Sequence, residues 1–150
     1  MANAAESNRI RDTDPLLQVE NLKKHFPMRA GPLRRVVNQV RAVDGVSLEI
    51  ATGQTVGLVG ESGCGKSTLG RAILQLQKPT AGQVFLAGQE ITGMPHTELK
   101  ASRRDMQIIF QDPYASLSPR RTVAQIIREP LEAHRIGSPA EQHRRVAELL

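Results

Sequence analysis

Residues 60–68 read GESGCGKST, and they directly follow the apolar run QTVGLV at Gln54–Val59. In the next nine residues, LGRAILQLQ, apolar side chains recur at helical spacing, at Leu69, Ala72, Ile73 and Leu76. We therefore expect a strand suited to a buried sheet position, a glycine-rich loop, and a helix that begins near Lys66 and ends before Pro79.

The loop matches the phosphate-binding pattern G-x-x-x-x-G-K-[ST], known as Walker A, in the strand–loop–helix setting that this pattern requires. Glycines have no Cβ to keep a phosphate away, so backbone N–H groups and the helix N-terminus can face the anion. We expect Lys66 to reach the β- and γ-phosphates of ATP, Ser67 to bind Mg²⁺ and Thr68 to lie near the α-phosphate. The expected ATP-binding residues of the loop are Gly60, Glu61, Ser62, Gly63, Cys64, Gly65, Lys66, Ser67 and Thr68.

Composition excludes several classes of site. Cys64 is the one cysteine of 150 residues, which excludes an internal disulfide framework and a cysteine-rich zinc or iron–sulfur centre, and we expect it to be a small loop residue. Aromatic residues make up 3% of the chain, which argues against nucleic-acid binding by base stacking. No stretch free of Asp, Glu, Lys and Arg exceeds eleven residues, whereas a membrane-spanning helix needs about 20 apolar ones. The N-terminus also lacks an apolar stretch of signal-peptide length.

Patterns elsewhere in the chain predict short strands and two further helices. We expect strands at Leu16–Leu22, Val43–Ile50, Gln83–Ala87 and Gln107–Phe110, and a disordered tail over residues 1–15. A helix is expected over Thr122–His134, and Pro130 is expected to end or kink it. Its inward-facing residues are expected to be Val123, Ile126, Ile127 and Leu131. Ser138 and Glu141 have the spacing of a capping box that opens a last helix.

Residues 27–40 contain Pro27, Gly31 and Pro32 and are expected to form a long loop. Basic residues gather in and around it without any acid, at Lys23, Lys24, Arg29, Arg34, Arg35 and Arg41. A solvated loop is the plainer interpretation of these charges, and a phosphate-rich or acidic partner is the alternative.

Two segments, residues 43–91 and IIFQDPYASLSPRRTV at 108–123, resemble the ATP-binding subunits of ATP-binding cassette (ABC) transporters. The resemblance is closest to the importers of oligopeptides and dipeptides, nickel or glutathione. It implies an α/β fold of the P-loop NTPase class, with an antiparallel β-subdomain, an incomplete RecA-like core and the start of a helical subdomain. It also implies that residues 16–150 are the N-terminal half of a nucleotide-binding domain, cut before the signature motif and the Walker B strand.

The same resemblance implies roles for single residues. Gln111 matches the Q-loop glutamine that ligates Mg²⁺ and organises the attacking water. Together with Lys66 of the Walker A loop, it is an expected catalytic residue. Phe26 matches the position that stacks an aromatic ring on adenine, with a core anchor as the alternative. Asp112–Arg121 matches the segment that contacts the transmembrane permease.

The resemblance further implies a protein bound peripherally to the cytoplasmic face of the membrane. It implies a second ATP-binding subunit as partner, an indirect link to a solute-binding protein, and no nucleic acid. The family hydrolyses ATP to drive transport, but we expect this chain alone to be inactive, because no residue in it matches the catalytic acid. We also expect apolar surface to be exposed on Gln107–Phe110 and on the helix that follows.

Two other classes of function are compatible with parts of the sequence. A small P-loop kinase would need an arginine-rich lid, for which Arg103-Arg104 and Arg120-Arg121 are the candidates, and it would leave Gln111 without a role. A non-catalytic nucleotide-binding fragment or interaction module would use the basic loop, but the chain has neither a stacking set of aromatic residues nor a zinc pattern.

Overall fold

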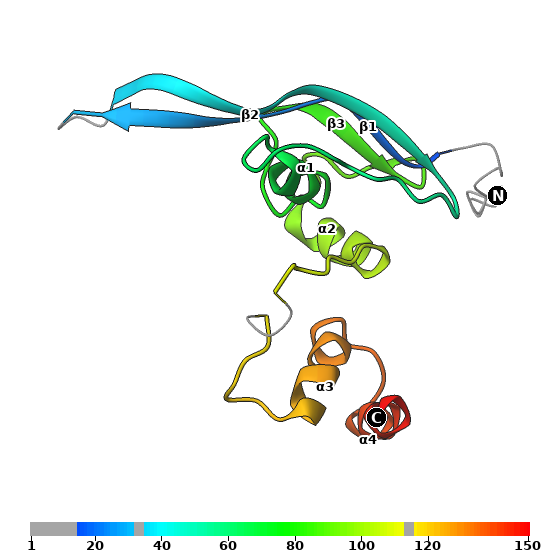
Figure 1. The fold of residues 1–150 in the computed structure, drawn as a ribbon. Coiled ribbons are helices and arrows are strands. Elements are labelled where there is room, and N and C mark those ends of the chain that lie inside the picture. The colour runs from blue at the N-terminus through cyan, green and yellow to red at the C-terminus, as the bar shows by residue number, and fades with distance from the viewer. Residues whose placement is uncertain (1–14, 32–34, 113–115) are drawn as a thin grey trace. The chain divides into compact units, whose positions relative to one another are not determined.

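The computed structural model describes residues 15–31, 35–112 and 116–150, which form two units that divide between Leu99 and Lys100 (Figure 1). The expected disordered tail lies, except for Pro15, outside the described residues. Each unit is described by itself below. Among the described helices, none is long and apolar enough to cross a membrane.

The first unit is built on an antiparallel sheet of four strands in the order β2-β1-β3-β4. The strands are β1 (Pro15–Ala30), β2 (Arg35–Ala51), β3 (Ala81–Leu86) and β4 (Gln89–Glu90). The strands expected at Leu16–Leu22 and Val43–Ile50 lie within β1 and β2. The one expected at Gln83–Ala87 forms β3 but ends at Leu86, because Ala87 and Gly88 take positive φ in the turn to β4. The antiparallel β-subdomain is therefore confirmed.

The prediction of a long loop over residues 27–40 is wrong. β1 and β2 stay paired from Pro15↔Ala51 to Ala30↔Arg35, so most of this segment is a two-stranded hairpin. The strand pairing of β1 with β3 ends at Lys23↔Ala81, and the side chain of Thr80 still bonds the backbone of His25. Beyond His25, no described strand pairs with this edge of β1. An open edge tolerates the missing N–H of Pro27, and the valines of β2 favour a strand.

The core of the first unit lies between the sheet and α1 (Lys66–Ile73), which contacts β1 and β2 (Figure 1). Leu69 and Ala72 of α1 are buried, as their spacing predicts. Burying one leucine side chain contributes roughly 1.5–3 kcal/mol, so these contacts fix the start of α1 against the strands. The other buried apolar residues of this unit are Val19, Leu22, Val43, Val84, Ile91 and Leu99.

Two strand predictions are wrong. Gln54–Val59 and Gln107–Phe110 have no regular secondary structure, and Val59 and Ile109 are 94% and 89% exposed. A strand needs a hydrogen-bonded neighbour, and no strand among residues 15–31, 35–112 and 116–150 pairs with either segment. The parallel RecA-like part of the fold is accordingly incomplete in the described residues.

Two short helical segments follow the sheet without having been expected. They are α2 (His96–Ser102) and the 3₁₀ turn η1 (Arg103–Asp105). The sequence pattern missed them because neither is long enough to show a helical repeat of apolar residues.

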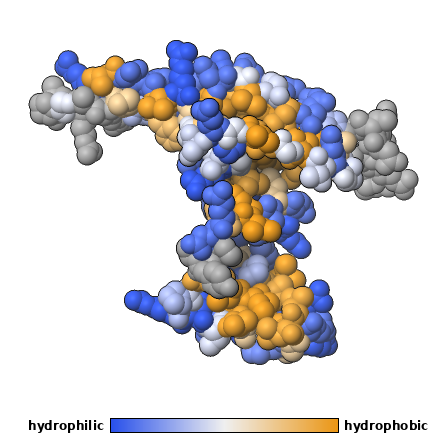
Figure 2. All heavy atoms as spheres, viewed as in Figure 1, coloured by the Kyte–Doolittle hydropathy of each residue, from blue (hydrophilic) through white to orange (hydrophobic). Residues whose placement is uncertain are grey.

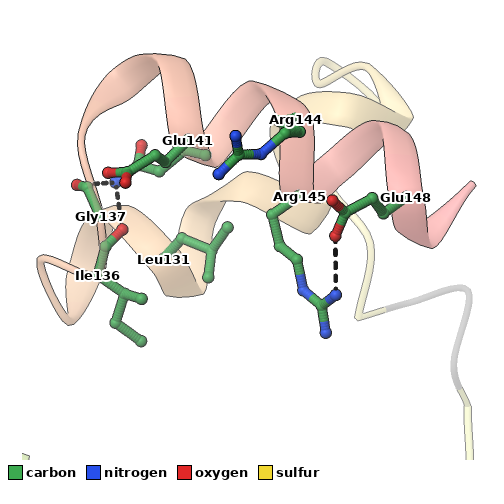
Figure 3. A pocket seen from close by; sticks show the side chains of 8 residues that line it. Leu131, Ile136, Gly137, Glu141, Arg144, Arg145 and Glu148 are labelled. Carbon is green, nitrogen blue, oxygen red and sulfur yellow. Dashed lines mark hydrogen bonds and ion pairs between the residues drawn. The ribbon is translucent and has the colours of Figure 1, made fainter.

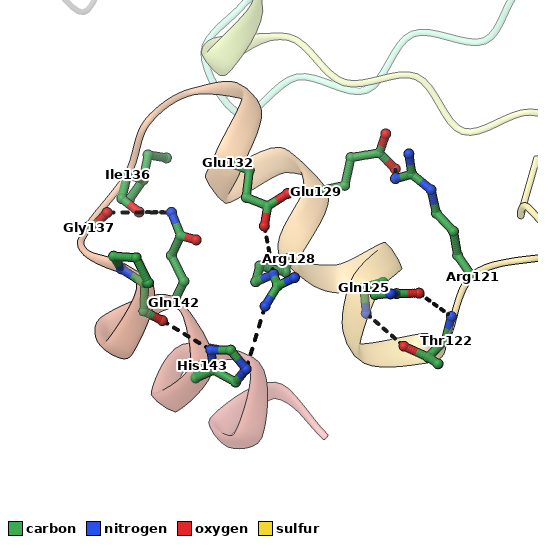
Figure 4. A network of polar contacts seen from close by, with 11 residues as sticks. Arg121, Thr122, Gln125, Arg128, Glu129, Glu132, Ile136, Gly137, Gln142 and His143 are labelled. Atoms are coloured by element: carbon green, nitrogen blue, oxygen red, sulfur yellow. Dashed lines mark hydrogen bonds and ion pairs between the residues drawn. The ribbon is translucent and has the colours of Figure 1, made fainter.

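The second unit contains two packed helices, α3 (Val123–Ala133) and α4 (Pro139–Leu149), close to the expected bounds. Both begin with a capping box. Ser138 pairs with Glu141 as expected, and Thr122 pairs with Gln125 (Figure 4), a box that was not predicted from the sequence. Pro130 does not stop α3 at once, since the helix continues to Ala133.

Apolar surface is exposed on this unit, as expected for Gln107–Phe110 and α3 (Figure 2). Ile126, Ile127 and Leu131 are half-buried. The inward position expected for Val123 is wrong, because this residue at the helix start is 62% exposed. The other exposed large apolar residues of the unit are Ile109, Phe110, Leu117, Ile136, Leu149 and Leu150.

Candidate nucleotide-binding site

The glycine-rich loop ends at Gly65, whose backbone holds a conformation that other residues rarely adopt. Gly65 is the N-cap of α1 and has φ +85° and ψ 34°, in the left-handed region. A Cβ at this position would overlap the carbonyl oxygen of Ala42 on β2. Glycine is thus required twice, by the turn into the helix and by the close approach of β2.

The N-terminus of α1 is open, because no side chain caps it. The N–H of Leu69 donates to the carbonyl of Gly65 at 3.2 Å, and the N–H groups of Lys66, Ser67 and Thr68 precede this bond in the first turn. These groups and the positive end of the helix dipole form a place where an anion is favoured. Ser67 is exposed and Thr68 is half-buried at this helix end.

The Lys66 ammonium folds back over the loop. It donates to the carbonyl oxygens of Gly60 at 2.8 Å and Glu61 at 2.9 Å, and its third contact is Cys64 Sγ at 3.9 Å. An ammonium has three donors, and the sulfur contact is the weakest of the three. A phosphate oxygen can therefore replace the sulfur while both carbonyl bonds keep the lysine in place.

Gly60 packs against the side chain of Cys64. A Cβ on Gly60 would lie 2.7 Å from Cys64 Sγ, so a larger residue there would require the cysteine side chain to move. Cys64 itself is a free, exposed thiol. The remaining loop residues, Glu61, Ser62 and Gly63, are exposed as well, with Gly63 at φ +80°.

A cavity of about 420 Å³ adjoins the loop, which is within the size range of small-molecule sites. One part of its lining is apolar, and another carries the cations Arg41 and Lys66 and the carboxylate of Asp44. The lining residues are Arg41, Ala42, Val43, Asp44, Val46, Leu58, Val59, Cys64, Gly65, Lys66 and Leu69. Arg41 belongs to the basic cluster noted in the sequence, but its place at the loop was not predicted, and Asp44 was not predicted at all. Both lie outside the motif and reach the loop through β2.

Asp44 connects this lining to β1. His25 Nε2 lies 2.9 Å from Asp44 Oδ1, and Arg41 donates to Asp44 Oδ2 at 3.4 Å. The hydrogen bond with His25 holds the pKa of the Asp44 carboxyl below its ordinary value of 3.8, and the positive charges of Arg41 and Lys23 act in the same direction. The carboxylate is thus charged at neutral pH.

Phe26 lies on β1 opposite Val40 and is 36% exposed. This exposure does not fit the core-anchor alternative. The ammonium of Lys24 sits 4.9 Å from the centre of the Phe26 ring, a cation–π arrangement that occupies one ring face. Phe26 is not among the residues that line the cavity beside Lys66.

Gln111 and the segment Asp112–Arg121 belong to the second unit. Gln111 is exposed, Asp112 accepts a hydrogen bond from Ser116 Oγ at 3.0 Å, and Arg121 pairs with Glu129 at 2.6 Å (Figure 4). Residues 113–115 lie outside the described residues. The loop residues are thus brought together within the first unit, and the role of Gln111 toward Mg²⁺ stays a prediction.

A smaller cavity of about 180 Å³ lies between α3 and α4 (Figure 3). Its lining includes Arg145, which pairs with Glu148 at 2.9 Å, and Glu141, which accepts from Ser138 in the capping box. The charged side chains of Glu141, Arg145 and Glu148 are thus engaged in contacts within the helical unit.

Comparison with known proteins gives one family for most of the chain. The model of the ABC transporter family matches residues 43–150. The chain is 46% identical over 138 residues to the oligopeptide transport ATP-binding protein AppF of Bacillus subtilis, which covers 91% of this chain and 42% of AppF. It is 52% identical over 137 residues to the glutathione import ATP-binding protein GsiA of Pectobacterium atrosepticum, which covers 91% of this chain and 22% of GsiA. The chain thus spans less than half the length of these relatives.

Among solved structures, the fold is similar to the ATP-binding cassette MJ0796 in a dimeric post-hydrolysis state bound to ADP and Pi. The TM-score is 0.70 at 30% sequence identity, and the match covers 88% of this chain and 54% of that cassette.

Proposed function

Because this chain belongs to the ABC transporter family, as an ATP-binding domain, we propose that ATP·Mg²⁺ binds at Gly60–Thr68 and drives an importer. The observation that carries the proposal is the open N-terminus of α1 behind Gly65, with the Lys66 ammonium held over the same loop by two carbonyls. Membership of this family disfavours the small P-loop kinase and the interaction module.

The side chains present fit a magnesium–nucleotide complex. Mg²⁺ is usually held by one or two protein oxygens together with phosphate oxygens and waters. The exposed hydroxyl of Ser67, in the first turn of α1, supplies one such oxygen. Gln111 supplies the second through its amide oxygen and senses the γ-phosphate through its NH₂ group.

Phe26 stacks on the adenine ring in this proposal. Its exposed face leaves room for a flat aromatic base, while the Lys24 ammonium stays on the ring. Stacking of this kind recognises the base, whereas the loop recognises the phosphates.

The partners and the solute follow from the relatives. AppF and GsiA are named for oligopeptide transport and glutathione import, so the transported solute is a peptide or a peptide-like molecule. We place the chain on the cytoplasmic face of the membrane, with Asp112–Arg121 against a permease subunit and a second ATP-binding subunit completing the site. ATP hydrolysis then belongs to that assembly, and the 150-residue chain by itself hydrolyses ATP far more slowly.

The test is ATP·Mg²⁺ binding measured by titration calorimetry on the wild-type chain, Lys66→Ala and Lys78→Ala. Lys66→Ala removes a charge-assisted phosphate contact and is expected to weaken binding at least about 100-fold. Lys78→Ala is the matched control, because Lys78 is exposed and lies outside the loop and the cavity, and it is expected to bind like the wild type. Equal ATP affinity in the wild type and Lys66→Ala would refute the assignment of the loop.

A further inference from the structure

The cavity beside the phosphate loop has a second cation that the Walker A motif does not contain. Arg41 lines it from β2, and Lys66 lines it from the first residue of α1. Both positive side chains border one space whose size suits a nucleotide-sized ligand. A cavity with two cations at its border favours a polyanion over a neutral molecule.

The backbone places Arg41 at the N-terminus of α1. Its neighbour Ala42 presents the carbonyl oxygen that a Cβ on Gly65 would overlap, so β2 touches the helix N-cap at this residue. The register of the sheet sets this position, since His25 on β1 is the strand partner of Arg41. Arg41 is therefore held one residue from the point where the phosphate-binding helix begins.

The guanidinium of Arg41 has Asp44 as its partner, and that contact is long. Its side chain is 69% exposed, and its contact with Asp44 Oδ2 is 3.4 Å long, whereas charge-assisted hydrogen bonds are usually about 2.7–2.9 Å. Asp44 is bound more closely by His25, at 2.9 Å. A guanidinium has five N–H donors in a fork that matches phosphate oxygens, so Arg41 can exchange Asp44 for a stronger anion.

We propose that Arg41 is a second phosphate-binding cation of this site and contacts the phosphate chain of the bound nucleotide beside Lys66. This inference rests on the proposed function, because it takes the nucleotide to lie on the same loop. The Asp44 carboxylate, which lines the same cavity, then stays paired with His25 while Arg41 turns toward the phosphates.

The test compares Arg41→Ala, Arg41→Lys and the matched control Arg35→Ala by titration calorimetry with ATP·Mg²⁺. Arg35 lies on the same strand and is exposed, but it does not line the cavity. Arg41→Ala is expected to weaken ATP binding about 5- to 50-fold, the effect of losing one charge-assisted contact at a partly exposed site. Arg41→Lys is expected to recover part of this loss, and Arg35→Ala to stay within about 2-fold of the wild type.

Sodium tripolyphosphate serves as a second ligand, since it has the phosphate chain without base or sugar. If Arg41 binds phosphates, Arg41→Ala weakens tripolyphosphate and ATP by a similar factor. A loss for ATP alone would mean that Arg41 touches the base or the sugar, and it would overturn the proposal. Wild-type affinity in Arg41→Ala would overturn it as well, while leaving the proposed function intact. No ATP binding by the folded wild type would instead overturn both.

Discussion

We expect the substitution of glycine by alanine to have opposite effects on thermal stability at Gly65 and at Gly70. Gly65→Ala puts a Cβ on a residue with φ +85° and drives it into the Ala42 carbonyl. Gly70→Ala puts the same methyl group in the middle of α1, where nothing lies within 4 Å of it. The two variants have identical composition, so the difference between them isolates the backbone geometry at the start of α1.

The magnitudes follow from the geometry. A left-handed conformation costs a non-glycine residue about 1–2 kcal/mol, and the overlap with Ala42 adds about 1–3 kcal/mol of overpacking. Gly70→Ala instead stabilises the helix by about 0.5–1 kcal/mol, because alanine loses less conformational freedom than glycine. For a unit of this size, about 1 kcal/mol shifts Tm by 4–8 °C, so Gly65→Ala is expected to lower Tm by at least about 8 °C.

The assay is thermal unfolding followed by circular dichroism for the wild type and both variants. We expect Gly70→Ala to melt a few degrees above the wild type and Gly65→Ala to melt well below it. The reasoning is refuted if Gly65→Ala melts at or above Gly70→Ala, because neither the positive φ nor the contact with Ala42 would then exist in solution.

Two further predictions concern Cys64 and Glu141. Cys64→Ser is expected to change ATP affinity by less than about 2-fold in titration calorimetry, because the contact of the sulfur to Lys66 is 3.9 Å long and a hydroxyl fits the same space. A loss of affinity comparable to that of Lys66→Ala would contradict the ranking of the three contacts of the Lys66 ammonium. The backbone and side-chain hydrogen bonds from Ser138 hold the pKa of Glu141 below its ordinary value of 4.5, so its stabilisation of α4 is complete above that pH and is lost as the pH falls through the lowered pKa. Circular dichroism at 222 nm is expected to show an acid loss of helix in the wild type that is smaller in Glu141→Gln, which keeps the cap without titrating; identical acid curves for the two proteins would count against the capping box.

Local features of the fold could be predicted from the sequence. The capping box at Ser138 and Glu141 depends on residues three apart, and the glycine-rich loop lies within nine consecutive residues. The burial of Leu69 and Ala72 follows from helical spacing alone. In each case the partners are near in sequence, so the pattern contains the information that determines the structure.

Features that depend on distant partners could not be predicted. Gln54–Val59 has the composition of a strand, but a strand forms only beside another, and none of the described strands pairs with it. Residues 27–40 have the composition of a loop, but pairing between β1 and β2 extends into them. Arg41 lies at the candidate site because β2 packs on Gly65, a contact that no local pattern indicates.

The central claim is that ATP·Mg²⁺ binds at the N-terminus of α1, and backbone amide NMR tests it most directly. Titration of the ¹⁵N-labelled wild-type chain with ATP·Mg²⁺ is predicted to shift the amide signals of Gly65, Lys66, Ser67 and Thr68 in a saturable way, since these N–H groups would donate to phosphate. The amides of α4 are predicted to stay in place and serve as the internal control. Saturable shifts elsewhere, with the Gly65–Thr68 signals unmoved, would contradict the account.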